Sequence, residues 1–319
     1  MTQIGGHIAA TRRPGALGVH SLDLVDVTVP DLRPAADFYR AFGLDVREEG
    51  NALALYTQGH AHRWARFTEA KEKRLSRLTF GAFADDMERF RQRLHERGIT
   101  PIDPPRGAEA DGLWLRDPDG LAIEIRVAEK SSPSDKAPMT MVSAPAGTAA
   151  APSRSRAGLV RPRRLSHALL FSSDIGRSIG FYQDVLGLRL SDRSGDGIAF
   201  LHGIHGSDHH MVAFARSGGN GLHHLSWDVA SIDEIGLGAM QMADKGFSAG
   251  WGLGRHVLGS NYFHYVRDPW GSWCEYSADI DYVPADHDWA SGDHPAEDAF
   301  YVWGPTPPAD FVVNHETAR

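Results

Sequence analysis

The sequence contains a single cysteine and lacks any long apolar run. Cys274 has no second thiol in the chain, so an intrachain disulfide is excluded. No stretch approaches the roughly 18 to 20 apolar residues that a transmembrane helix needs. The segment from Met1 to Pro14 has two arginines but neither the apolar region nor the cleavage site of a signal peptide. We therefore expect a protein that works in a reducing, cytoplasmic setting and does not enter a membrane.

Basic residues are also scarce relative to acidic ones. The chain has 33 Lys and Arg against 41 Asp and Glu, a formal net charge of -8 and a pI near 6.1. A negative balance of this kind does not favour nucleic acid as a partner. The one basic cluster, from Arg161 to Arg164, lies beside a linker and is predicted to be a solvated end of it.

The composition is that of an ordinary globular protein of about two domains. The chain has 319 residues, of which 42% are hydrophobic and 23% charged. Residues 129–160 are rich in Ala, Ser, Pro and Lys with no sustained apolar period, which predicts a flexible linker. The predicted domains span residues 15–128 and 161–283, and residues 284–319 form a C-terminal tail.

The two halves repeat one pattern of elements. Residues 22–29 alternate like a strand, and residues 34–44 have the pattern of a helix that ends at a glycine. In the second half, residues 167–171 and 179–188 follow the same order. The repeat predicts that both halves fold in the same way.

Later landmarks extend the correspondence to the end of each half. Residues 85–94 and 231–240 both resemble a capped helix followed by a glycine-containing turn. Residues 117–124 and 268–275 share the pattern Asp-Pro-x-Gly-x-x-x-Glu, a tight turn followed by an alternating strand. One helix and several strands in each repeated unit predict an α+β fold built from duplicated modules.

Three side chains at matching places of the second half can bind a metal. His167 lies in the first predicted strand, His223-His224 in a later one, and Glu275 in the strand that ends the repeat. Two imidazoles and one carboxylate are the ligand set of a non-haem Fe(II) oxygenase with open coordination positions. A lone histidine on a strand is more often structural, and 17 histidines are present, so the prediction depends on all three together. Because neighbouring strand residues point to opposite faces, we expect only one of His223 and His224 to enter a cavity.

The first half does not carry the same set. Leu24 stands where the second half has His167, and Arg77 stands where it has His224, whereas Glu124 matches Glu275. One carboxylate alone cannot hold a divalent ion with useful affinity. We therefore expect no metal in the first half.

At this level of detail the chain resembles a known family. The repeat, the Asp-Pro-x-Gly-x-x-x-Glu endings, the stretch Gly254-Arg255-His256 and Tyr265 are similar to the two-domain extradiol ring-cleavage dioxygenases of the vicinal oxygen chelate superfamily, over roughly residues 15–285. The resemblance implies two domains, each of two βαβββ modules that curl into an incomplete barrel. It also implies iron in the C-terminal cavity only, and cleavage of a catechol-type ring by O2 beside the vicinal diol to a muconic semialdehyde-type product.

The resemblance also assigns roles to individual residues. It selects His224 as the second histidine ligand and implies that His210, of the pair His209-His210, is the acid-base residue. It places His256 and Tyr265 at the substrate oxygens. Each of these three could equally be a loop or strand residue without a function. Four further histidines are weaker candidates, expected to be structural or to support the site: His205, His209, His223 and His264.

Aromatic and basic residues suggest how a substrate is held. Four aromatic residues are predicted at the mouth of the cavity: Trp227, Trp251, Phe263 and Trp270. Arg255 and Arg267 could bind a substrate carboxylate. Residues 286–313 combine large aromatics with prolines and should pack on something. Similar tails in some branches of the family that the chain resembles lie over the active-site mouth, so the resemblance implies a lid over the cavity, with an oligomer contact as the equal alternative.

Two other functions remain open at this stage. A glyoxalase-like isomerase or thiol transferase of the same superfamily would need ligands in both halves, which Leu24 and Arg77 disfavour. A metal-free binding module would leave the second-half ligand set unexplained. We expect Fe(II) as the cofactor, with Mn(II) also accepted by these ligands, and a small aromatic diol and O2 as the partners. We also expect a homo-oligomer, with a tetramer favoured.

Overall fold

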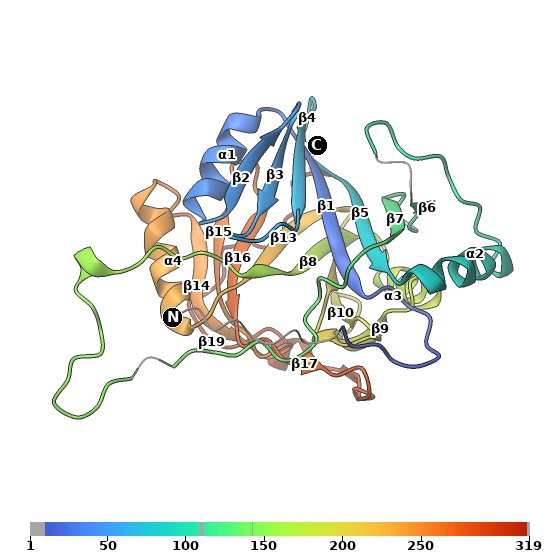
Figure 1. The fold of residues 1–319 in the computed structure, drawn as a ribbon. Helices are drawn as coiled ribbons and strands as arrows, with labels where there is room; N and C mark the ends of the chain where they lie inside the picture. Colours follow the sequence, from blue (N-terminus) through green and yellow to red (C-terminus); the bar gives the residue numbers. More distant parts are fainter. Residues whose placement is uncertain (1–9, 109–111, 142, 318–319) are drawn as a thin grey trace.

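The computed structural model describes residues 10–108, 112–141 and 143–317 and consists mainly of two open β-sheets with few helices (Figure 1). None of the described helices has the length and apolarity that crossing a membrane requires. The first half of the chain forms a seven-stranded sheet in the order β2-β3-β4-β1-β5-β7-β6. Its elements, in chain order, are β1 (Ser21–Val29), α1 (Leu32–Ala41), β2 (Asp45–Glu49), β3 (Ala52–Tyr56), β4 (Ala65–Glu69), β5 (Arg74–Ala82), the 3-10 helix η1 (Ala84–Asp86), α2 (Met87–Glu96), β6 (Leu113–Arg116) and β7 (Ala122–Val127).

The second half forms a ten-stranded sheet in the order β18-β9-β10-β12-β8-β13-β16-β15-β14-β19, and β11 pairs with β17 beside it. Its two outermost strands, β18 and β19, come from the C-terminal tail. The elements are η2 (Arg154–Arg156), β8 (Arg164–Ser172), α3 (Ile175–Asp184), β9 (Arg189–Ser194), β10 (Ile198–His202), β11 (Ser207–Asp208), β12 (Val212–Arg216), β13 (Gly221–Asp228), α4 (Ile232–Asp244), β14 (Gly250–His256), β15 (Tyr262–Arg267), β16 (Trp273–Ala278), β17 (Tyr282–Val283), β18 (Gly292–Asp293), η3 (Ala296–Asp298) and β19 (Tyr301–Trp303).

The predicted α+β repeat is confirmed. In each half the first strands of the two modules pair antiparallel, β1 with β5 and β8 with β13. The last strand of the second module then pairs parallel to the first strand of that module, β7 with β5 and β16 with β13. Two modules have the βαβββ order, and a third, from β8 to β12, has it with the two-residue strand β11 inserted. Among the described residues, the second module of the first half has only β6 and β7 after its helix, because the preceding segment is a loop. This loop contacts the sheet through hydrogen bonds from Ile102 N to the Trp114 carbonyl and from Arg66 and Arg77 to the Gly107 carbonyl.

The helices begin and end where the sequence supplies the chemistry. Asp31, Asp174 and Ser231 are extended N-cap residues whose side chains accept a hydrogen bond from the first helical turn. Gly43, just after α1, has φ +98, and a Cβ there would lie 2.1 Å from the carbonyl oxygen of Val160. Glycine is required at this place because both the positive φ and the close approach exclude a side chain.

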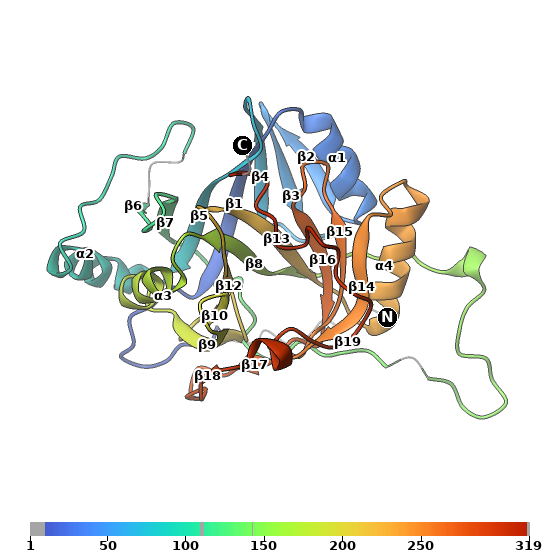
Figure 2. The ribbon, with the colours of Figure 1, turned by 180° about the vertical axis from the view of Figure 1, so that it is seen from behind.

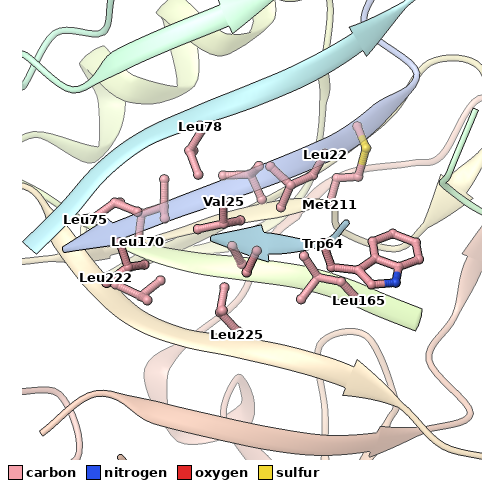
Figure 3. Close-up of a cluster of buried hydrophobic side chains, with 14 of the residues drawn as sticks. Leu22, Val25, Trp64, Leu75, Leu78, Leu165, Leu170, Met211, Leu222 and Leu225 are labelled. Carbon is pink, nitrogen blue, oxygen red and sulfur yellow. The ribbon is translucent and has the colours of Figure 1, made fainter. Parts of the chain in front are cut away.

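The two halves share one hydrophobic core. Figure 3 shows side chains of both sheets meeting face to face, including Leu22 and Val25 of β1 with Leu170 and Leu225 of the second half. Burying a Leu or Val side chain stabilises a fold by about 1.5–3 kcal/mol. One face of the second half's sheet therefore packs against the sheet of the first half.

The segment between the halves, residues 129–160, has no helix or strand among its described residues except η2. Figure 1 shows it, in green, running along the outside of the sheets. Its start is held in place, because the amides of Ser131 and Ser132 both donate to Ser21 Oγ. The prediction that the basic cluster after it is solvated was wrong for Arg164, whose side chain is only 12% exposed and forms a two-point ion pair with Asp208.

The tail crosses the open face of the second half's sheet, as Figure 2 shows. Trp251 Nε1 donates to the Pro305 carbonyl, and Trp273 Nε1 donates to the Phe311 carbonyl. Near the end, the buried Glu316 carboxylate accepts from Lys73 Nζ at 2.6 Å and from two backbone amides. The tail is therefore joined to both halves by buried polar contacts.

Candidate active site

A cavity of about 980 Å³ lies between the second half's sheet and the tail. The predicted ligands and catalytic residues all line it. The polar lining residues near its base are His167, His210, His223, His224, His256, Asn261, Tyr265 and Glu275. Its wall is mostly apolar, with Leu169, Ile198, Phe200, Ala215, Leu258, Ala296, Ala299, Phe300, Phe311 and Val312.

Three adjacent strands, β8, β13 and β16, bring the predicted ligands together. His167 on β8 and Glu275 on β16 are both paired with Ser226, which lies between them on β13. His224 is two residues earlier on β13 and therefore faces the same side. The sheet register places three residues from distant parts of the sequence at one point.

The geometry of the three ligand atoms fits a metal ion. His167 Nε2 lies 3.2 Å from His224 Nε2, and Glu275 Oε2 lies 3.4 Å and 3.5 Å from these nitrogens. Three ligands about 2.1 Å from one ion, at angles between right and tetrahedral, are roughly 3.0–3.4 Å apart. Glu275 Oε2 is buried and has no hydrogen-bond partner among the described residues, as expected of an atom reserved for an ion.

Hydrogen bonds behind the site orient His167 toward this point. Ser166 Oγ donates to Asp208 Oδ2 at 2.7 Å and lies 3.3 Å from His167 Nδ1. Because the hydroxyl proton goes to Asp208, Ser166 can only accept from His167 Nδ1–H, which leaves Nε2 free of a proton. A metal-binding histidine needs this arrangement.

The expectation that only one of His223 and His224 enters the cavity was wrong. The pairing of β13 with β8 shifts register between Leu222 and His224, so His223 lies in a bulge. A bulge breaks the alternation of side chains. Both histidines line the cavity, with their Nδ1 atoms 2.7 Å apart, but only His224 belongs to the cluster of ligand atoms.

The three predicted catalytic residues surround the cluster. The His210 ring lies 4.0 Å from the His167 ring, measured between centroids. His256 Nδ1 donates to the Phe300 carbonyl at 2.9 Å, so its Nε2 accepts from the Tyr265 hydroxyl at 2.8 Å. The sequence analysis missed Asn261, whose Nδ2 donates to Glu275 Oε1 at 3.1 Å, because an asparagine in a turn has no spacing signal.

Burial sets the protonation of these groups. It lowers the pKa values of His210, His224 and His256, so the imidazoles are neutral near pH 7 and can act as ligands or hydrogen-bond acceptors. Burial raises the pKa of Tyr265, which keeps its hydroxyl as a donor. Burial alone would raise the pKa of Glu275, but the adjacent His167 and His256 outweigh it, so the carboxylate stays ionised.

The matching place in the first half is filled by ion pairs. Arg77 donates to both oxygens of Asp26, at 2.9 Å and 3.1 Å, and Arg66 donates to the same carboxylate at 2.6 Å. Glu124 accepts from Thr79 Oγ1 at 2.8 Å. The carboxylates of Asp26 and Glu124 are thus both engaged by neighbouring side chains of the first half.

The predictions for the mouth of the cavity were largely wrong. None of the four predicted aromatics is among its lining residues. Trp227 is next to Ser226 on β13 and faces the opposite side of the sheet. Trp251 and Phe263 lie on the same face as Tyr265 but are buried in a cluster with Phe311 of the tail. Arg267 is held by two hydrogen bonds to Asp310, and Arg255 donates to the Ser260 carbonyl and the Tyr262 hydroxyl. The apolar wall comes partly from tail residues, which had no signal beyond their aromatic content.

Of the remaining weak candidates, two histidines lie outside the cavity and one contacts a residue of the site. His205 Nε2 bonds the Gly18 carbonyl, outside the cavity, and His264 is likewise absent from its lining. His209 contacts His210 directly, with 3.0 Å between their Nδ1 atoms.

Comparison with known proteins places this site in a family. A sequence model of the Glyoxalase/Bleomycin resistance protein/Dioxygenase superfamily matches residues 21–125 and 164–276. The chain belongs to this superfamily. It is 50% identical to metapyrocatechase 2 of Cupriavidus necator over 298 residues, which cover 93% of each chain. The resemblance to extradiol dioxygenases is thereby confirmed.

More distant superfamily members carry different metals. An iron-dependent extradiol dioxygenase of Rhodococcus jostii is 29% identical over 153 residues, 44% of this chain and 50% of that protein. The structure of a Mn(II)-bound glyoxalase from Novosphingobium aromaticivorans matches with a TM-score of 0.71 and 25% identity, covering 92% of this chain and 96% of that one. The superfamily relationship therefore does not choose between the two metals.

Proposed function

We propose that this protein is an Fe(II)-dependent extradiol dioxygenase that opens a catechol-type ring with O2 beside the vicinal diol. The observation that carries the proposal is the set of His167, His224 and Glu275 at the base of a largely apolar cavity, with ligand atoms 3.2–3.5 Å apart. The 50% identity to a metapyrocatechase supports the same reaction. The product is a muconic semialdehyde-type compound.

His167, His224 and Glu275 would hold the metal, which supplies adjacent positions for the two diol oxygens and for O2. The protein's own residues would then position the substrate and transfer protons to or from it. The Tyr265 hydroxyl and the His256 ring form a hydrogen-bonded pair beside Glu275 and would contact a substrate oxygen. His210, on the other side of His167, would move a proton to or from the reacting oxygens, since a neutral imidazole suits that task near pH 7.

The wall of the cavity favours a hydrocarbon ring. Leu169, Phe200, Leu258 and Phe311 all line it, and burying apolar substrate surface against them contributes to binding. The tail contributes part of this wall, so we propose that residues 284–317 cover the site as a lid. We further propose domains at 15–128 and 161–283, a homo-oligomer such as a tetramer, and a cytoplasmic location.

The test is oxygen uptake by the metal-loaded full chain. Protein purified without oxygen is loaded with Fe(II) or Mn(II) and mixed with catechol, 3-methylcatechol, 2,3-dihydroxybiphenyl and a trihydroxybenzene. Stoichiometric O2 consumption with a yellow, pH-sensitive semialdehyde is expected, with higher turnover for iron. A colourless diacid product would contradict extradiol cleavage. Metal binding without O2 consumption for any diol would instead favour an isomerase of the same superfamily.

A further inference from the structure

A chain of hydrogen bonds leads from the proposed acid-base residue away from the cavity. His209 Nδ1 lies 3.0 Å from His210 Nδ1, and His209 Nε2 lies 2.8 Å from Asp192 Oδ2. The three side chains are joined end to end, and both rings are buried. His209 is the neighbour of His210 in sequence, whereas Asp192 comes from β9.

The carboxylate of Asp192 is held from the opposite side by the tail. Its Oδ1 accepts from the Gly292 amide and from His294 Nε2, both at 2.8 Å, and Trp289 Nε1 donates to Oδ2 at 3.3 Å. Strand β18 pairs with β9 at the same point, Gly292 opposite Asp192. Burial alone would raise the pKa of Asp192, but the hydrogen bonds from His209, His294 and Gly292 outweigh it and lower the pKa to about 2.

An ionised carboxylate determines which nitrogens carry protons. Asp192 can only accept, so His209 Nε2 must donate to it, and an imidazole that carries a single proton then has an unprotonated Nδ1. This Nδ1 can only accept, so the proton between the two rings belongs to His210 Nδ1. The remaining nitrogen of His210, Nε2, is therefore unprotonated, and it is the ring nitrogen that can accept a proton in the cavity that His210 lines.

We infer that Asp192 and His209 are positioning residues that fix the orientation and tautomer of His210, and that residues 289–294 of the tail complete this arrangement. The inference depends on the proposed function, in which His210 transfers protons. A base whose tautomer is fixed by a hydrogen-bonded carboxylate loses much of its activity when that contact is removed, because the wrong nitrogen then faces the substrate. The tail therefore forms part of the cavity wall and also helps to orient His210.

The first experiment separates orientation from folding with a matched pair of variants. Asp192→Asn removes the obligate acceptor, and Asp228→Asn removes a comparably buried carboxylate that pairs with Arg163 outside the cavity. For Asp192→Asn we expect kcat to fall by about 10- to 100-fold, with the substrate KM and iron content within about twofold of the wild type. Asp228→Asn should keep the wild-type kcat per bound iron. Equal kcat losses in both variants, or none in Asp192→Asn, would overturn the inference.

The second experiment tests the acceptor on His209. The side-chain oxygen of Asn reaches about as far from the backbone as the Nδ1 of histidine, so His209→Asn keeps an acceptor for His210, whereas His209→Leu keeps none. His209→Asn should therefore retain clearly more kcat than His209→Leu at equal iron content. Equal loss of kcat in the two variants would show that His209 acts only through packing.

A third measurement does not depend on turnover. In the Zn(II)-loaded full chain with ¹⁵N-labelled histidine, the His210 signals are identified by their loss in His210→Phe. We expect a protonated Nδ1 and a bare Nε2, and a shift towards the other tautomer in Asp192→Asn. The opposite tautomer in the wild type would overturn the inference even if the protein cleaves catechols. The expected tautomer in a protein that cleaves none would leave the positioning intact and refute only the dioxygenase proposal.

Discussion

The two halves of this chain share a fold but differ at the same three places. In the second half, His167, His224 and Glu275 face one another across a space suited to an ion. In the first half Leu24 and Arg77 replace the histidines, and the Arg77 guanidinium pairs with Asp26. The backbone therefore offers the same place in each half, and two side chains there make the difference between the proposed set of metal ligands and an ion pair. Function depends on the residues placed on the fold and not on the fold alone.

The largest expected effect is loss of the metal. His167→Ala removes one of three protein ligands, so we expect iron content and turnover to fall below detection while the circular dichroism spectrum stays that of the wild type. Glu124→Gln, at the matching place of Glu275 in the first half, should retain one iron per chain. Metal analysis of both proteins makes the comparison. Full iron and turnover in His167→Ala would remove that residue from the ligand set.

The next effect concerns proton transfer. With His210→Phe the ligands are untouched, so iron and substrate should still bind. Turnover should slow by roughly 10²- to 10⁴-fold, the range for a lost general acid or base. Anaerobic substrate titration and single-turnover kinetics measure the two properties separately. Unchanged kinetics would make His210 a structural histidine.

A stability effect is expected in the first half. Asp26→Ala leaves the largely buried Arg77 and Arg66 without their shared carboxylate, which should lower the free energy of unfolding by about 3–5 kcal/mol. Asp45→Ala, which breaks the partly exposed pair with Arg47, should cost less than about 1 kcal/mol. Urea unfolding measures both. If iron content per folded chain fell in Asp26→Ala, the two halves would not be as independent as the comparison implies.

The smallest expected effect is a change in acid sensitivity. Burial lowers the pKa of His20 to about 4, so the folded state keeps this ring neutral while the unfolded chain protonates it below about 6.5. The unfolded state then binds more protons, and stability falls as the pH drops from about 6.5 towards 4, by up to about 1.4 kcal/mol per pH unit from this residue. His20→Gln should flatten this dependence in urea unfolding of the metal-free protein at pH 7, 6 and 5. The exposed His95→Gln variant should match the wild type in slope; a His20→Gln protein that does so too would contradict the prediction.

The repeat was readable because it depends on local signals. The helix cap at Ser231, and the turns before Glu124 and Glu275, are short patterns with a direct physical cause. The proposed ligands followed because they occupy matching places of a repeated unit. Long-range packing could not be read in this way. The bulge at His223 and the buried position of Trp251 depend on strand register, which the residues in each strand do not determine alone.

Contacts of the tail had no local signal either. Nothing in the neighbourhood of Asp192 shows that Gly292 and His294, about a hundred positions later, donate to it. The apolar wall was predicted as a property but assigned to the wrong aromatics, because Phe300 and Phe311 reach the cavity only after the tail has crossed the sheet. Contacts between distant segments must be observed in the folded chain.

The position of the tail at the end of the sequence also sets an order of events during translation. His167, His224 and Glu275 all leave the ribosome before Trp289, and Glu316 follows later still. Because domains fold as they emerge from the N-terminal side, the growing chain can bring the three proposed ligands together before the tail's part of the wall and its donors to Asp192 exist. A nascent chain stalled after Glu275 would therefore present the three proposed ligands without the tail that covers them. The cavity is complete only after the tail has emerged, so the proposed ligands can assemble before the orientation of His210 is fixed.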